Sequence, residues 1–123
     1  MKLTSLRPML WTNDLDMTIE FYNKILGFKI LNYNQEVGWV TLGRDDLEIM
    51  FAKPNEHIEF DKPFFTGSFY FVTDTVDKVW ADVKDKVSVI YGIENFDWQM
   101  REFAILDNNG YMLQFGQEIE TAN

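Results

Sequence analysis

The sequence predicts an α+β fold in which two βαβββ repeats form a curled mixed sheet with a concave cleft, helices outside. The first observation is an internal repeat, because Trp39–Phe51 can be laid on Phe103–Phe115 without a gap, apolar position on apolar position. The second is the order of apolar segments, which reads strand–helix–strands twice. The length of 123 residues suits one domain over 1–123, with repeat one at about 5–53 and repeat two at about 66–117.

The first repeat opens with an apolar strand over Leu6–Thr12. Asn13 or Asp14 can cap the following helix, and Gly27 can end it in the left-handed conformation. The apolar positions of this helix follow helical spacing: Met17, Phe21, Tyr22, Ile25 and Leu26. Three strands are expected next, with a turn over Gly43–Asp46: Phe28–Tyr33, Glu36–Leu42 and Leu47–Ala52.

The second repeat has the same order of elements after a polar connector over Pro54–Pro63. A strand over Ser68–Thr73 leads to a helix capped at Asp74. Its apolar positions recur at helical spacing: Val76, Val79, Trp80 and Val83. The remaining strands are expected at Val87–Gly92, Gln99–Leu106 and Tyr111–Phe115.

Alternation along the strands predicts which side chains line the cleft. Alternate residues of Leu47–Phe51 are uniformly apolar and should pack under the helix, so Glu48 and Met50 point into the cleft. The repeat transfers these places to Met112 and Gln114. The other side chains expected on the open side are Arg7, Trp39, Thr41, Ser68, Tyr70, Arg101, Phe103 and Ile105. An aromatic wall with sparse polar groups is typical of a small-molecule site, although the same rings would also suit a core or a dimer interface.

Composition excludes several classes of protein. The chain has no Cys, so disulfides, thiolate metal sites and cysteine nucleophiles are absent. Twenty acidic against 11 basic residues give a net charge of −9, which disfavours nucleic acid and anionic membranes and favours cationic ligands. No apolar run is long enough to span a membrane, and the first residues do not read as a signal peptide. We therefore expect a soluble, cytoplasmic protein.

Several motifs resemble the vicinal-oxygen-chelate superfamily of glyoxalases, bleomycin-resistance proteins and dioxygenases. They are the run Leu10–Leu15, the pair Phe21-Tyr22, Leu26-Gly27-Phe28 and the turn Asp107–Tyr111, in which Asn108 departs from the family's Pro. The bleomycin-resistance proteins are the closest likeness, through these segments: Lys2–Ser5, Pro8–Leu10, Arg44–Asp46, and Trp98 followed by Arg101–Ala104.

The resemblance implies four metal-ligand positions in the metal-dependent members of the family. In this chain these positions read Arg7, Ser68, Gln114, and either Met50 or Glu48. A divalent metal needs several His or carboxylate ligands, and the sole His57 lies in the connector. We therefore expect no metal and no other cofactor. We also expect no catalytic residue, since Ser68 has no partnering His and Arg7 would hold Glu48 ionised.

The likeness to the resistance proteins instead implies a homodimer that sequesters a cationic, aromatic small molecule, such as a bleomycin-type antibiotic, without chemical change. Pro8 would aid exchange of the first strand between subunits. The expected ligand-binding residues are Trp39, Glu48, Met50, Tyr70, Trp98, Phe103, Met112 and Gln114. Two alternatives stay open: a metal-dependent glyoxalase-type lyase or extradiol-type dioxygenase, and a binder of an unknown metabolite.

Overall fold

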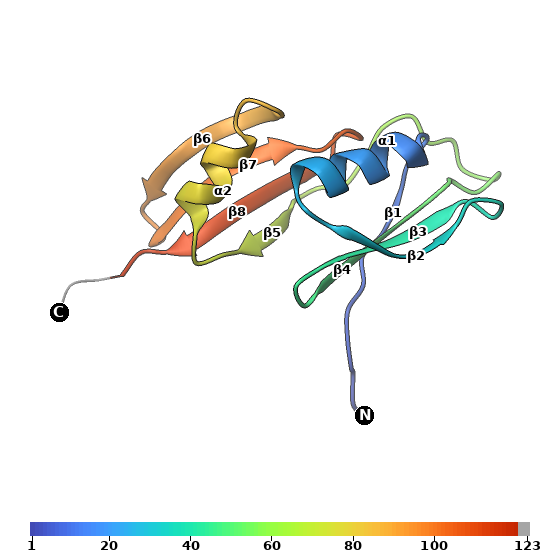
Figure 1. The fold of residues 1–123 in the computed structure, drawn as a ribbon, viewed down its shortest axis with the longest axis horizontal. Coiled ribbons are helices and arrows are strands. Elements are labelled where there is room, and N and C mark those ends of the chain that lie inside the picture. Colours follow the sequence, from blue (N-terminus) through green and yellow to red (C-terminus); the bar gives the residue numbers. More distant parts are fainter. Residues whose placement is uncertain (121–123) are drawn as a thin grey trace. The chain divides into compact units, whose positions relative to one another are not determined.

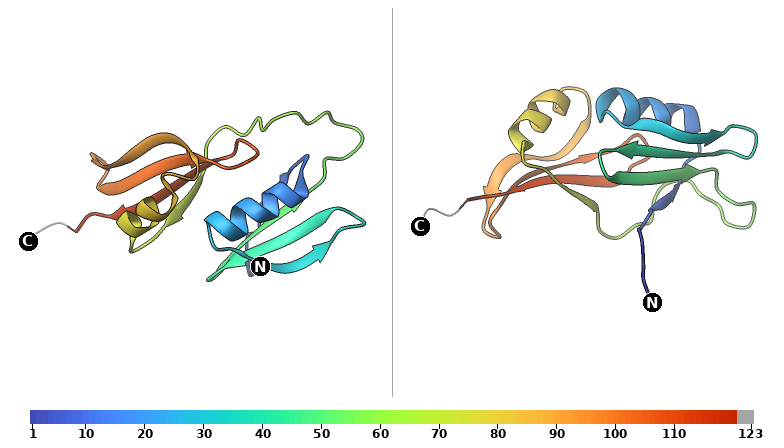
Figure 2. Two further views of the ribbon diagram at one scale, coloured as in Figure 1. Left: turned by 45° about the horizontal axis from the view of Figure 1, so that its top comes forward. Right: turned by 60° about the horizontal axis from the view of Figure 1, so that its bottom comes forward.

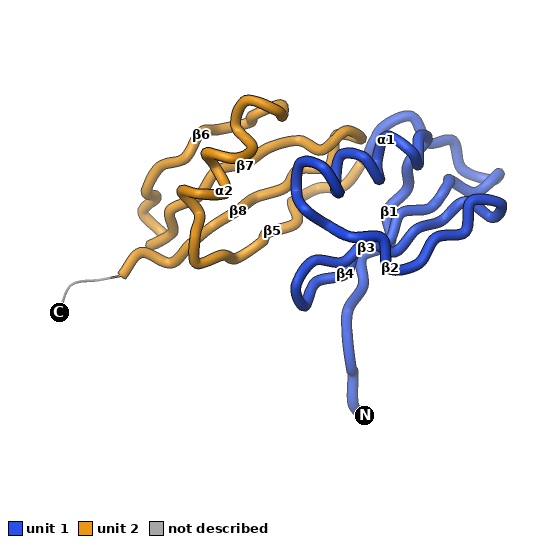
Figure 3. The backbone as a smooth tube through the Cα atoms, viewed as in Figure 1, with its two compact units in different colours: residues 1–63 blue, residues 64–123 orange. Residues whose placement is uncertain are grey.

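Two compact units, residues 1–63 and 64–123, make up the structure, which is a computed structural model and describes residues 1–120 (Figure 3). Each unit has a helix lying on one face of a four-stranded mixed sheet, as the ribbons show (Figures 1 and 2). The strand orders are β1-β4-β3-β2 and β5-β8-β7-β6. The predicted pair of βαβββ repeats, with helices outside the sheets, is therefore confirmed.

Unit 1 begins its regular structure later than the sequence predicts. The strand β1 spans only Met9–Trp11, and the carbonyl of Pro8 accepts a hydrogen bond from the amide of Met50 at 2.8 Å. The segment before Pro8 carries no regular structure and projects from the unit (Figure 2). The other elements are α1 (Leu15–Glu20), a π-helical continuation (Phe21–Ile25), β2 (Lys29–Asn34), β3 (Trp39–Arg44) and β4 (Leu47–Ala52).

The helical segment of unit 1, which is α1 with its π-helical continuation, starts and stops where the sequence signals place it. The Asp14 carboxylate accepts a hydrogen bond from the amide of Met17 at 3.0 Å, and Gly27 ends the helix with a φ of 74°. Met17 was expected on the buried face, but it is exposed. Its place is taken by Thr18, whose hydroxyl is buried against that of Thr12 at 2.9 Å. Burial of this pair is possible because both hydroxyls are hydrogen-bonded.

Unit 2 contains β5 (Phe69–Val72), α2 (Val76–Val83), β6 (Ser88–Phe96), β7 (Met100–Leu106) and β8 (Met112–Glu118). The N-cap of α2 is Thr75, one residue after the predicted Asp74. The β6 strand runs four residues past the predicted Gly92, since its pairing with β7 continues to Phe96 and Met100. The result is a long β6–β7 hairpin.

The helix side of each sheet forms the core of its unit. In unit 1 it holds Val40, Leu42, Ile49 and Phe51, all nearly or fully buried under α1, as predicted. In unit 2, Leu113 and Phe115 are buried under α2 in the same way. The predicted alternation is therefore confirmed for β3 and β8, and in β4 for Ile49 and Phe51. Leu47 was also expected under the helix, but it is exposed, because it is the first residue of β4, next to the turn. The opposite face of each sheet is left open.

The predicted orientation of β7 is wrong. Phe103 is 0% exposed and packs against Trp80 of α2 and Phe115, with ring centroids 5.0 and 5.2 Å apart. Ile105 is buried too, and Arg101 pairs with Asp77 of α2 at 2.8 Å. The gap-free repeat had assigned all three side chains to the open face.

A turn that is longer by one residue explains the error. Val40 pairs with Phe51 in unit 1, whereas Phe103 pairs with Phe115 in unit 2, so the second hairpin holds one more residue between equivalent positions. The Asp107 carboxylate stabilises this longer turn by accepting hydrogen bonds from the amides of Asn109, Gly110 and Tyr111 at 2.8–2.9 Å. A one-residue shift moves every side chain of a strand to the other face, and here it places Glu102 and Ala104 on the open side.

Among residues 1–120, no helix is long and apolar enough to cross a membrane. The cytoplasmic location expected from the sequence stays a prediction.

Candidate ligand-binding faces

The open face of unit 2 is organised around a buried carboxylate. Glu102 on β7 is only 1% exposed. Its Oε1 accepts hydrogen bonds from the Tyr70 hydroxyl and from Trp98 Nε1, both at 2.7 Å. Its Oε2 accepts one from the Tyr91 hydroxyl and one from Gln114 Nε2 at 3.1 Å. Donors from three strands and the β6–β7 turn thus converge on one side chain.

Tyr70 reaches Glu102 by lying across the intervening strand β8. The place it crosses is Gly116, the register partner of Glu102. A Cβ atom at Gly116 would stand 2.1 Å from the Tyr70 hydroxyl oxygen and 2.7 Å from its ring. Only glycine leaves room for the ring there, so the hydrogen bond between Tyr70 and Glu102 depends on the absence of a side chain at residue 116.

Trp98 lies in the turn between β6 and β7. Its ring stacks on Phe96 with centroids 4.6 Å apart and an interplanar angle of 13°, while its Nε1 donates to Glu102. Gln99, the next residue, adopts a φ of 65°, which is unusual for a residue with a side chain. The turn therefore accepts an unfavourable backbone conformation and holds the indole over the face of unit 2.

The hydrogen bonds keep Glu102 ionised. Burial acts to raise the pKa of Glu102, but the hydrogen bonds from Tyr91, Trp98, Tyr70 and Gln114 together lower it below its ordinary value. Burial and the contact with Glu102 also raise the pKa of Tyr91 to about 12 and raise the pKa of Tyr70 further. The two phenols therefore remain protonated donors and the carboxylate remains charged around neutral pH.

The remaining polar groups of this face are paired with one another. The Ser68 hydroxyl bonds to Gln114 Oε1, and Gln114 Nε2 donates to the Tyr91 hydroxyl at 2.6 Å. Met112, on the same face of β8 as Gln114, is half-buried. The face thus presents rings and a thioether around a satisfied polar network.

The open face of unit 1 carries an ion pair instead. Arg7 donates to Glu48 from Nε at 2.7 Å and from Nη2 at 2.6 Å, and its Nη1 lies 4.0 Å from the Met50 sulfur. The expected contact between Arg7 and Glu48 therefore forms. Trp39 lies on the same face, because its register partner Ala52 comes two residues after Met50 in β4. The Trp39 side chain is half-buried.

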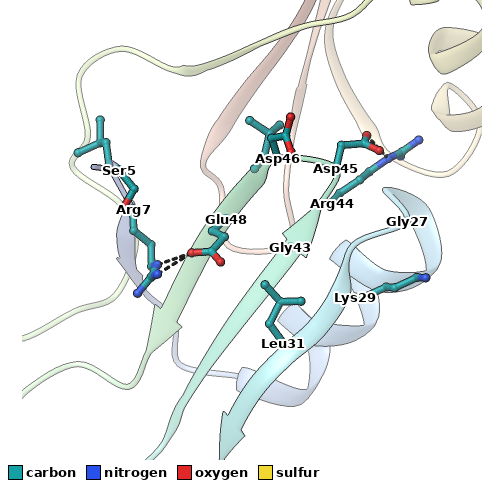
Figure 4. Close-up of a pocket in the computed structure, with 12 residues that line it drawn as sticks. Ser5, Arg7, Gly27, Lys29, Leu31, Gly43, Arg44, Asp45, Asp46 and Glu48 are labelled. Carbon is teal, nitrogen blue, oxygen red and sulfur yellow. Dashed lines mark hydrogen bonds and ion pairs between the residues drawn. The ribbon is translucent and has the colours of Figure 1, made fainter. Parts of the chain in front are cut away.

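A pocket of about 840 Å³ opens beside this ion pair, at the end of the sheet of unit 1 (Figure 4). The apolar part of the pocket lining is made by Leu6, Leu31 and Leu47. The Leu31 side chain from β2 packs closely over Gly43, in the space that a Cβ atom at residue 43 would need. The polar part of the lining includes the paired Arg7 and Glu48, labelled in the figure. This pocket combines a hydrophobic wall with an already neutralised charge pair.

The residues at the implied metal-ligand positions do not fit a divalent metal. Arg7 is a cation and is bonded to Glu48, while Ser68 and Gln114 bond to each other. Met50 pairs with Met9 in unit 1 in the same way as Gln114 pairs with Tyr70 in unit 2. Met50, and not Glu48, is therefore the residue of unit 1 at the metal-ligand position equivalent to Gln114. Among residues 1–120, no three His, Asp or Glu side chains are grouped to hold a metal ion. A guanidinium, a thioether, a hydroxyl and an amide are poor ligands for such ions.

The predicted site residues fall into three groups. Trp39, Glu48 and Met50 lie on the open face of unit 1; Tyr70, Met112, Gln114 and Trp98 lie at the open face of unit 2. Phe103 lies in the core instead. The sequence did not lead us to Glu102 or Tyr91. The alternating apolar residues Phe103 and Ile105 in β7 could have predicted that these two are buried and that Glu102 therefore lies on the open side.

Gly116→Ala should displace the Tyr70 ring and break its hydrogen bond to Glu102. We expect a loss of about 1–3 kcal/mol in the free energy of unfolding, because one buried acceptor loses its donor and the ring loses its packing. Urea unfolding of the wild type, Gly116→Ala, Tyr70→Ala and the double variant measures this. In the Tyr70→Ala background the same substitution should cost much less; an equal cost in both backgrounds would mean that Tyr70 is not what it displaces.

Glu102→Gln should make the stability of the protein less sensitive to acid. The folded-state pKa of Glu102 lies below its unfolded value of about 4.3, so its ionised form stabilises the fold above that value and this contribution is lost as the pH falls through the folded pKa. Urea unfolding at about pH 7 and about pH 4 should show a smaller pH-dependent loss in the variant. Identical losses in both proteins would exclude Glu102 as a contributor to acid sensitivity.

Comparison with known proteins identifies the family. The model of the glyoxalase/bleomycin resistance protein/dioxygenase superfamily matches residues 5–115. No curated protein matches the sequence significantly.

Solved structures share the fold at low sequence identity. A glyoxalase/bleomycin resistance protein/dioxygenase from Nocardioides has a TM-score of 0.81 at 12% identity, covering 100% of this chain and 88% of that one. TioX from Micromonospora sp. ML1 has a TM-score of 0.78 at 13% identity, with 94% and 99% covered. A lactoylglutathione lyase from Agrobacterium tumefaciens has a TM-score of 0.70 at 17% identity, with 93% and 92% covered. With the family model spanning most of the sequence, the chain belongs to the glyoxalase/bleomycin resistance protein/dioxygenase superfamily.

Proposed function

We propose that the protein is a metal-independent binding protein that sequesters a cationic, aromatic small molecule without changing it chemically. The observation that carries this proposal is the ionised carboxylate of Glu102 beneath the rings of Tyr70, Tyr91 and Trp98. A fixed negative charge attracts a cation, and the neighbouring aromatic faces bind both its charge and its flat apolar part. The net charge of −9 adds a favourable long-range field.

The protonation states of the same groups argue against acid–base catalysis. A general base should have a pKa near the working pH, whereas the pKa of Glu102 is lowered and those of Tyr70 and Tyr91 are raised. The Ser68 hydroxyl donates its proton to Gln114 Oε1 instead of to a general base, and unit 2 contains no His. Together with the poor metal-ligand set, these features favour binding over the lyase or dioxygenase chemistry found elsewhere in the superfamily.

The open face of unit 1 also carries groups that can contact a flat ligand. Trp39 offers a ring surface and Met50 a polarisable thioether, two groups that suit flat ligands. Glu48 is already paired with Arg7, so its part in attracting a cation is smaller than that of Glu102.

The likeness of several motifs to bleomycin-resistance proteins supports a bleomycin-type glycopeptide as the ligand, and with it a role in antibiotic resistance. A metabolite of similar charge and shape would use the same contacts. The proposal also includes a homodimer, supported by the exposed apolar side chains of Leu3, Leu6 and Met9 around Pro8. We propose neither nucleic acid nor a membrane as a partner.

Titration of tryptophan fluorescence with a bleomycin-type glycopeptide tests the antibiotic proposal. We expect saturable quenching with a Kd on the order of 10 µM or tighter, equivalent to about −7 kcal/mol. Trp98→Ala and Trp39→Ala should each weaken binding about tenfold, because each removes an aromatic contact surface. Phe64→Ala, which removes an exposed ring at the start of unit 2, is the control and should leave the Kd unchanged. Absence of quenching at about 100 µM would overturn the antibiotic assignment.

Light scattering tests the dimer. At about 10 µM protein we expect twice the mass of one chain, because apolar side chains at the N-terminal segment are exposed on a single chain. Deleting residues 2–7 should shift the mass towards that of one chain while circular dichroism stays unchanged. A monomeric mass for the full chain at this concentration would remove the dimer from the proposal.

A further inference from the structure

The acceptor capacity of Glu102 is already fully used. A carboxylate offers about four lone-pair sites, and four donors occupy them: Tyr70, Trp98, Tyr91 and Gln114. The side chain is also 1% exposed, so a ligand cannot reach its oxygens without displacing one of these donors. The negative charge of Glu102 can therefore attract a cationic ligand, but the ligand cannot form a direct hydrogen bond to the carboxylate.

The charge itself is not neutralised within the unit. Among residues 1–120, no Lys, Arg or His side chain forms an ion pair with Glu102. Arg101, its neighbour in the chain, points to the helix side and pairs with Asp77 in a bidentate contact of 2.8–3.2 Å. Phenol, indole and amide donors spread the negative charge but add no positive charge, so the face of unit 2 keeps a net negative potential.

Trp98 offers a ring surface on which a ligand can bind close to the negative charge of Glu102. Trp98 is 60% exposed although one face of its ring is stacked on Phe96, so the other face of the ring is open to solvent. Tyr70, also in contact with Oε1 of Glu102, is 40% exposed. Cations bind over such ring faces with about 0.5–2 kcal/mol, Trp being the strongest partner.

We infer, building on the proposed function, that the face of unit 2 selects aromatic cations without N–H donors, such as quaternary ammonium compounds, and that Glu102 is its specificity-determining residue. A primary ammonium or a guanidinium is held in water by hydrogen bonds and loses them at this face, because the oxygens of the charged group are occupied. A quaternary ammonium has no N–H groups to satisfy and gains both the ring contact and the attraction of the buried charge.

Other carboxylates on the open face do not change the preference. Glu94 on β6 is the register partner of Glu102, and Glu118 on β8 follows Gly116 at a two-residue interval, but both are exposed to solvent. Contacts between a primary ammonium and an exposed carboxylate are worth little, because both groups are well hydrated before they meet.

Three matched phenyl compounds test the inference by isothermal titration calorimetry: benzyltrimethylammonium, benzylammonium and neutral benzyl alcohol. We expect benzyltrimethylammonium to bind at least about tenfold more tightly than either of the others, a difference of about 1.4 kcal/mol. Glu102→Gln should reduce its advantage over benzyl alcohol to less than about threefold. Asp82→Asn, which removes one charge from the helix side of the same unit, is the matched control and should preserve the order.

Trp98→Phe keeps the test decisive if Glu102→Gln does not fold. Phenylalanine retains a ring but lacks the indole N–H, so it frees one lone pair on Oε1. Benzylammonium should then gain affinity relative to benzyltrimethylammonium.

The outcomes separate the inference from the function on which it rests. If a bleomycin-type glycopeptide binds but benzylammonium equals or exceeds benzyltrimethylammonium, the selectivity is overturned and the binding function stands. If neither the glycopeptide nor any phenyl compound binds, both are overturned.

Discussion

A buried carboxylate without a cationic partner is the constraint on which the open face of unit 2 depends. Removing such a charge from water costs several kcal/mol, and a hydrogen bond to a charged group contributes about 1.5–3 kcal/mol. Four donors are therefore enough to offset the burial of Glu102, whereas a single donor is not. Two further features, glycine at residue 116 and the unusual φ of Gln99, make sense as conditions for two of these four contacts.

The two repeats have diverged at equivalent places. Trp39 in β3 and Glu102 in β7 occupy the same position once the turns are aligned correctly, so a ring in unit 1 corresponds to a charge in unit 2. Arg7 and Ser68 correspond in the same way at the opening strands. The open face of unit 1 therefore carries a neutralised charge pair, whereas that of unit 2 carries a single buried negative charge without a cationic partner.

Most of the fold could be predicted from the sequence because the signals for it are local. The Asp14 cap, the stop at Gly27 and the apolar alternation of β4 and β8 each act over a few residues. The site could be predicted only in part, because it depends on register. The extra residue near Asp107 turns β7 over, and a gap-free comparison of the repeats cannot detect it. The path of Tyr70 over Gly116 joins residues far apart in the chain and is visible only in three dimensions.

The same network that favours binding also disfavours chemistry. A carboxylate that acts as a general base needs an available lone pair and a pKa close to the working pH. Glu102 meets neither requirement, because each of its hydrogen-bond donors lowers its pKa and occupies one of its lone pairs. What remains useful is its electric field, which acts through space and needs no vacant lone pair. In the proposed function, such a face distinguishes ligands by charge and by hydration and leaves the bound molecule unchanged.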